Sequence, residues 1–78
     1  DNAEGIMVFP NPATNSIIIF SQENIAAGTY TISDLNGKVI LTGKLSGTVI
    51  NISSLHSGIY FIAVSANGNT FFKKIFKQ

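Results

Sequence analysis

The chain has 78 residues, of which 45% are hydrophobic and only 12% are charged. A chain of this length forms a single domain, because it can bury only about 60% of its unfolded surface, and its low charge is atypical of disordered proteins. Five lysines, no arginine and four acidic residues give a net charge of +1, which offers no binding field for nucleic acid. The absence of cysteine excludes disulfides, thiolate metal sites and a cysteine nucleophile.

Neither a membrane-spanning segment nor a signal peptide is predicted. No run approaches the roughly 18 apolar residues that a transmembrane helix needs. Residues 1–5 lack a basic region followed by an apolar one. If the protein is exported, we expect its N-terminal targeting signal to precede residue 1.

Apolar residues recur at intervals of one and two, with many β-branched and aromatic side chains, so the sequence predicts strands and no helix. The first strand, Ile6–Phe9, ends at Pro10, Asn11 and Pro12. The two prolines remove backbone donors, which predicts a stiff corner at a sheet edge. The run within Ser16–Ser21 is apolar throughout, so we expect that strand to be buried on both faces.

A hairpin is predicted from Gly28–Asp34 and Lys38–Leu45, joined at Asn36-Gly37. Alternation in its first strand places Tyr30 and Ile32 on one face. In its second strand we expect Val39, Leu41 and Leu45 to point inward and Lys38, Thr42 and Lys44 outward.

The second half of the chain predicts three more strands. Thr48–Ile52 is short, and Leu55 in the following turn is expected to plug the core. Gly58–Ala66 is apolar on both faces and therefore central, and a second Asn-Gly turn leads into Asn69–Lys77. Seven strands without a covering helix predict two packed antiparallel sheets, an all-β, immunoglobulin-like sandwich with minimal loops.

Three possible sites are weak. His56 lies among serines, yet nothing supplies the rigid geometry and oxyanion hole of a catalytic triad. Asp34 and Asn36 resemble part of a calcium loop, but no second acid follows, and a hydrogen-bonded turn explains the same residues. A glycosylation sequon at Asn51 falls within a predicted strand. We expect neither enzymatic activity nor a metal or cofactor.

The last strand is the most unusual segment. Alternation sends Phe71 and Ile75 to one face and Phe72 and Phe76 to the other, so both faces are apolar. Lys73 shares the first face and Lys74 the second. An edge strand protected from aggregation by lysine explains this pattern. An edge kept available for another protein, through strand addition or charge, explains it equally.

Four segments together carry a family resemblance: Phe9-Pro10-Asn11-Pro12, Asp34-Leu35-Asn36-Gly37-Lys38, Ile52 to Phe61, and Lys73 to Lys77. In order and spacing, from about Met7 to Gln78, the chain resembles the type A C-terminal sorting domain of the type IX (Por) secretion system. The resemblance implies a folded secretion signal at the end of a cargo protein. It also implies passage through the periplasm, recognition by the outer-membrane translocon, and removal by a sortase-like peptidase, with the cargo secreted or held at the cell surface.

The resemblance divides the chain into a linker or cleavage-proximal lead, 1–5, and the sorting domain, 6–78. Its motifs fall on residues that we expect the translocon to recognise: Pro10, Asn11, Pro12, Gly58, Tyr60, Lys73, Lys74 and, beside them, Lys77. Structural roles explain several of these equally well, since a glycine can serve a backbone angle and a tyrosine the core.

Two other functions fit a small β-sandwich. A carbohydrate-binding or adhesion module of a secreted enzyme would present exposed aromatic side chains on a flat or concave surface. A structural spacer would present no special surface at all.

Overall fold

The computed structural model describes residues 6–21, 25 and 27–78. These residues form seven strands: β1 (Ile6–Phe9), β2 (Ser16–Ser21), β3 (Thr29–Ser33), β4 (Val39–Lys44), β5 (Val49–Asn51), β6 (Gly58–Ala66) and β7 (Asn69–Lys77). Each predicted strand is present, and β3, β4 and β5 are one residue shorter at each end than predicted. Nothing in the described ranges is a helix capable of crossing a membrane.

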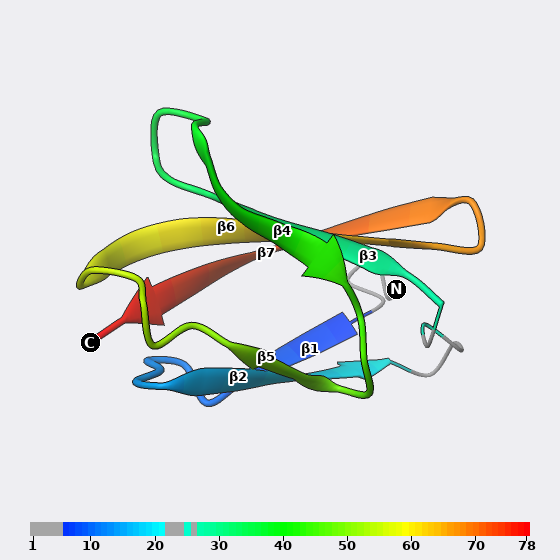
Figure 1. Cartoon of the computed structure of the whole chain (residues 1–78), viewed down its shortest axis with the longest axis horizontal. Coiled ribbons are helices and arrows are strands. Elements are labelled where there is room, and N and C mark those ends of the chain that lie inside the picture. The colour runs from blue at the N-terminus through cyan, green and yellow to red at the C-terminus, as the bar shows by residue number, and fades with distance from the viewer. Residues whose placement is uncertain (1–5, 22–24, 26) are drawn as a thin grey trace.

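The strands pack as two antiparallel sheets, which confirms the predicted sandwich (Figure 1). One sheet has three strands in the order β1-β2-β5, and the other has four in the order β4-β3-β6-β7. In Figure 1 the four-stranded sheet lies above the three-stranded one. As predicted, β6 is central, because it pairs with β3 on one side and with β7 on the other.

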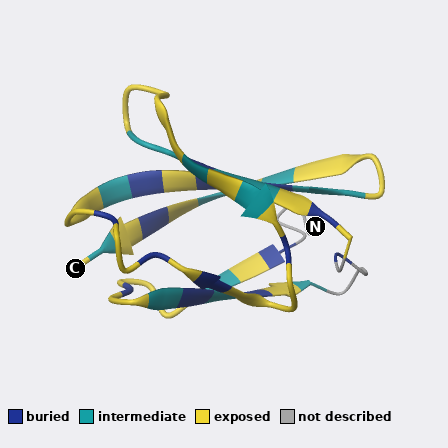
Figure 2. Ribbon diagram, in the orientation of Figure 1, coloured by how far each residue is buried: buried dark blue, intermediate teal, exposed yellow. Residues whose placement is uncertain are grey.

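The core is a single layer between the sheets, seen as the dark segments of Figure 2. Alternation turns every second residue of each strand into this layer. β-Branched side chains fill it: the largest fully buried ones are Ile6, Ile17, Ile19, Ile32, Ile52, Ile62, Val64 and Ile75. Leu55 is also buried, as the prediction of a plug required.

The turn between β3 and β4 is held by Asp34. Its carboxylate accepts hydrogen bonds from the backbone N–H of Asn36 at 2.9 Å and of Lys38 at 3.0 Å. Gly37 has a φ of 84°, the conformation that glycine adopts most readily. These bonds confirm the turn interpretation, and no cluster of metal-binding side chains occurs among the residues described.

The prediction that Val39 points inward is wrong, because its side chain is 54% exposed. The pairing of β3 with β4 shifts register between Ile32 and Ser33, so that Leu41 pairs with Ile32 but Val39 pairs with Ser33. Such an irregularity places two residues of one strand opposite one of the other and breaks the alternation. Leu45 belongs to the core and Leu41 packs against it, as predicted.

The prediction that β2 is buried on both faces is also wrong. Ile17 and Ile19 are fully buried, but Phe20 is 53% exposed on the opposite face. The neighbouring strands expose further apolar side chains, Met7, Phe9 and Val49. Met7 pairs with Phe20 across the ladder. Nothing in the described part of the chain covers the outer side of this sheet.

Candidate functional site

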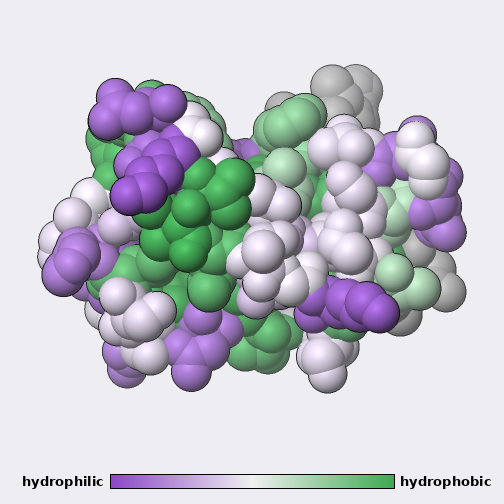
Figure 3. Space-filling view, turned by 45° about the horizontal axis from the view of Figure 1, so that its top comes forward, coloured by the Kyte–Doolittle hydropathy of each residue, from purple (hydrophilic) through white to green (hydrophobic). Residues whose placement is uncertain are grey.

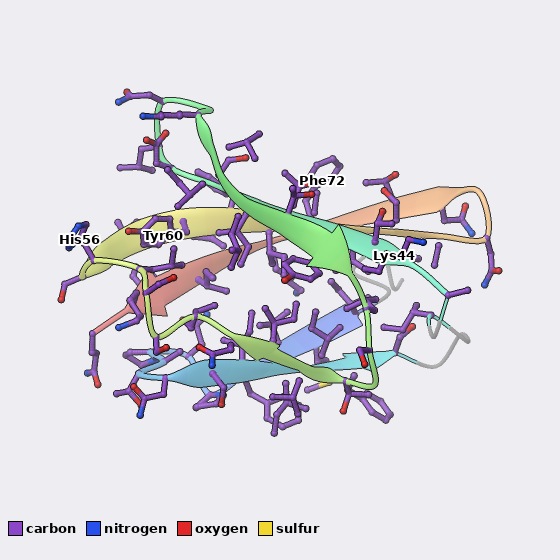
Figure 4. The ribbon with its side chains drawn as sticks, in the orientation of Figure 1. Lys44, His56, Tyr60 and Phe72 are labelled. Atoms are coloured by element: carbon purple, nitrogen blue, oxygen red, sulfur yellow. The ribbon has the colours of Figure 1, made fainter. Side chains whose placement is uncertain are left out.

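The predicted recognition segment, β7, forms one edge of the four-stranded sheet. Its inner side contributes Ile75, fully buried, and Phe71, which packs against the core. Its outer side presents Phe76 and Phe72, and the Phe72 ring is 69% exposed. Figure 4 shows Phe72 above the sheet, directed away from the core. The face that Phe72 and Phe76 share is therefore the one directed away from the opposite sheet.

The three lysines of β7 lie on two sides of the strand. Lys74 shares the exposed outer side with Phe72 and Phe76, and its Nζ lies 5.9 Å from the centroid of the Phe76 ring. Lys73 and Lys77 are half-buried and share the inner side with Ile75. Long lysine stems cover apolar surface in this way while their amino groups reach solvent. Lys74 is thus the lysine of β7 that is presented most openly.

Apolar side chains extend from β7 over the outer side of the four-stranded sheet. Phe61 of β6 pairs with Lys74, and Ala63 pairs with Phe72. Exposed side chains on this sheet include Val39, Ile40, Phe61, Phe72 and Phe76. Figure 3, with the upper sheet turned forward, shows a hydrophobic patch bordered by hydrophilic side chains. Apolar patches with polar rims are typical of interaction sites.

Asn11 fastens the corner after β1 to the outer edge of β7. Its side-chain Nδ2 donates to the Lys74 carbonyl at 3.1 Å, and its Oδ1 accepts from the Phe76 N–H at 2.9 Å. Two residues later, Ala13 pairs with this edge through backbone bonds of 2.8 Å to Phe76 and Gln78. The prolines of the motif, Pro10 and Pro12, flank Asn11 and are exposed. The N-terminal and C-terminal motifs therefore form one continuous structure.

Replacing Asn11 with alanine should lower the free energy of unfolding by about 1 to 2 kcal/mol, because two hydrogen bonds to the β7 backbone are lost together. Urea unfolding of the purified chain measures the change. Asn36→Ala is the matched control, since this exposed turn residue makes no side-chain hydrogen bond in the described structure. Equal losses in the two variants would contradict a clasping role for Asn11.

Gly58 and Tyr60 have structural roles at the start of β6. Gly58 has a φ of 153°, which side-chain-bearing residues rarely adopt. The Tyr60 ring is only 8% exposed, and its hydroxyl donates to the His56 carbonyl at 2.8 Å. Figure 4 shows His56 and Tyr60 near one end of the sandwich. A tyrosine bonded to the backbone a few residues upstream is the tyrosine corner of immunoglobulin-like domains.

Tyr60→Phe should keep the packing of the ring but lose the hydroxyl bond, with an expected cost of about 1 kcal/mol of unfolding free energy. Chemical denaturation tests this expectation. Tyr30→Phe is the control, because the Tyr30 hydroxyl has no hydrogen-bond partner among the described residues. If both variants are equally stable, the corner bond contributes nothing to the fold.

His56, the only histidine of the sequence, is exposed in the turn before β6, where its backbone carbonyl accepts the Tyr60 hydroxyl. The Asn51 carboxamide accepts bonds from the Ser53 backbone at 2.8 Å and hydroxyl at 2.7 Å, so it serves the local turn. Sequence reasoning missed two features of the site, the Asn11 clasp and the outer apolar patch. The predicted lead, 1–5, lies outside the described residues.

Comparisons with known proteins agree with this architecture. The solved structure of PorZ, described as an essential surface component of the type-IX secretion system of Porphyromonas gingivalis, is similar, with a TM-score of 0.73 and 18% identity. The likeness covers 99% of this chain but 12% of that one, and at this identity it shows the fold alone. No curated protein sequence matches significantly. The family model for the secretion system C-terminal sorting domain matches residues 7–78, and the chain therefore belongs to that family.

Proposed function

We propose that this domain directs a cargo protein, carried on the same precursor, through the type IX outer-membrane translocon. The observation that carries the proposal is the family match over residues 7–78, which includes every motif of the candidate site. The PorZ likeness supports it, because that protein contains a domain of this fold within a much longer chain. The domain would act as a folded secretion signal, and the cargo would be secreted or kept at the cell surface.

The proposed recognition surface is the outer side and edge of β7. Lys74 and Phe72 are exposed there, and Asn11 with its two prolines adjoins them. Lys73 and Lys77 line the inner side of the same strand with amino groups that can reach solvent. Gly58 and Tyr60 would contribute indirectly, by holding β6 in register with β7.

We further propose that the domain passes through the periplasm and is then removed by a sortase-like peptidase near the lead, 1–5. The chain is the substrate in that step. An extended lead of this length spans at most about 18 Å, so a cut there would separate the cargo close to β1.

Sugar binding is the weaker alternative. The exposed rings on the outer side of the sheet are phenylalanines, and the sequence contains no tryptophan. Phenylalanine supplies an apolar face without the polar handle of tryptophan or tyrosine, and Tyr60 is buried.

The test is a fusion of residues 1–78 behind a periplasmic reporter enzyme, expressed in a strain with a type IX system. Reporter activity should be found at the surface or in the medium, and the same fusion should stay inside an isogenic strain that lacks the translocon. A fusion retained in the periplasm of the competent strain would rule out the sorting function.

A further inference from the structure

The outer edge of β7 is only half occupied. In an antiparallel ladder, residues alternate between bonding the neighbouring strand and turning their backbone groups away from it. Asn11 and Ala13 bond Lys74, Phe76 and Gln78 on the outer edge, so the even-numbered residues of β7 are the ones that turn away from β6. Thr70 and Phe72 belong to the same set.

The free half of this edge consists of the Thr70 and Phe72 backbone groups and the Lys74 N–H. None of these groups has a partner among the described residues. It extends from the β6–β7 hairpin, orange in Figure 1, to the point where Asn11 begins, a length of about 13 Å. An edge of unpaired N–H and C=O groups is a template for another strand.

The molecule itself shows what this edge accepts. Ala13 pairs with Lys77 in the parallel direction, and the Asn11 side chain supplies one carbonyl and one N–H as a strand backbone would. A second extended segment placed before Asn11 would continue the same row of bonds. The bonds in the occupied half thus indicate that an added strand would run parallel to β7. The free half has room for about four residues of that strand.

The side chains beside the free half indicate the chemistry of the occupant. Phe72 is 69% exposed on the outer side, and Lys74 follows it on the same side, without an ion pair in the described structure. In an added parallel strand, the residues adjoining Phe72 and Lys74 are two apart and share that outer side. The complementary pattern is an apolar residue followed two positions later by an acidic one.

We propose that a component of the export machinery binds this domain by adding an extended segment, parallel to β7, to the free half of its edge. The added strand bonds Thr70, Phe72 and Lys74 through its backbone, covers the Phe72 ring with an apolar side chain and pairs an acidic side chain with Lys74. This inference rests on the proposed sorting function and specifies how the partner recognises β7.

Proline substitution distinguishes the contribution of the edge backbone from that of the side chains. Phe72→Pro removes an outward N–H that strand addition needs but no bond to β6, and proline is tolerated at such edge positions. Phe72→Ala removes only the ring. Thr70→Pro is compared with Thr42→Pro, because each threonine turns its backbone outward at one edge of the sheet and places its hydroxyl near a neighbouring hydroxyl, at 3.0 and 3.4 Å. Thr42 also donates to the Tyr30 carbonyl at 3.0 Å, so Thr42→Pro removes at least as much local bonding as Thr70→Pro.

The readout is export of the reporter fusion, with the thermal unfolding of each purified domain measured alongside. We expect Phe72→Pro and Thr70→Pro to reduce export about tenfold or more, Phe72→Ala to reduce it about two- to fivefold, and Thr42→Pro to match the unsubstituted fusion. If Phe72→Pro fails to fold, Thr70→Pro against Thr42→Pro decides.

Three outcomes overturn the inference. Normal export of both β7 proline variants, with the unsubstituted fusion exported, rejects strand addition and leaves the sorting function intact. Retention of the unsubstituted fusion rejects both. A purified domain that sediments as a dimer, and that Phe72→Pro converts to a monomer, assigns the edge to a second copy of this chain.

Discussion

Replacing Ile62 with alanine should lower the free energy of unfolding by about 3 to 4 kcal/mol, because the substitution leaves a cavity that a thin core cannot close. Ile62 is fully buried in the central strand β6, where it pairs with Ile32 of β3 and with Lys73 of β7. A domain of this size is stable by only about 4 to 12 kcal/mol in total. The variant should therefore lose a large share of its stability.

The control is Phe72→Ala, which removes a larger apolar side chain from an exposed position. We expect it to cost less than about 1 kcal/mol, since surface substitutions have small effects. Urea unfolding of both variants, with equal slopes, gives the comparison. A Phe72→Ala loss as large as that of Ile62→Ala would show that the outer side of the sheet is covered in solution.

The strand pattern could be predicted because it depends on local properties. Two Asn-Gly pairs set the hairpins, and alternation placed Ile32 inside and Thr31 outside. The prediction that Val39 points inward was wrong for a reason that alternation along a single strand does not reveal. The register shift in β3 and β4 is a property of the strand pair, and a sequence read one strand at a time gives no sign of it.

The outer surfaces could not be predicted, because both faces of β2 and β7 are apolar in sequence. Alternation separates Phe71 from Phe72 but does not say which of the two meets the opposite sheet. Only the packing of β7 against the core assigns Phe71 to the inside. The apolar character of the uncovered faces is thus a structural finding, and exposed apolar patches of this kind are typical of interaction sites.

The Asn11 clasp was invisible in sequence for a different reason. Its bonds span 63 and 65 residues, and a single asparagine between prolines has no periodic signal. The prolines predicted a corner at a sheet edge, and the structure supplies the edge itself. The motif at the start of the domain thus bonds the strand that carries the motif at its end.

Replacing Lys73 and Lys74 together with alanine should impair export of the reporter fusion while leaving the domain folded. Lysines at the surface contribute less than about 1 kcal/mol each, so the loss of stability should be small. Lys74 is exposed beside Phe72, whereas Lys73 lies half-buried on the inner side. We therefore expect Lys74→Ala alone to account for most of the export defect, and Lys73→Ala for most of the change in stability through its packed stem.

The double variant Lys38→Ala with Lys44→Ala is the matched control, because it removes the same charge from two exposed lysines at the opposite edge of the sheet. Reduced export in both double variants would point to net charge, and not to β7, as the property that the machinery reads. Unchanged export in the Lys73 and Lys74 variant would limit these lysines to protecting an edge strand from aggregation. A defect confined to the β7 variant, with an unfolding midpoint close to that of the unsubstituted domain, is the result that a recognition role requires, because it separates the reading of the strand from the folding of the domain that presents it.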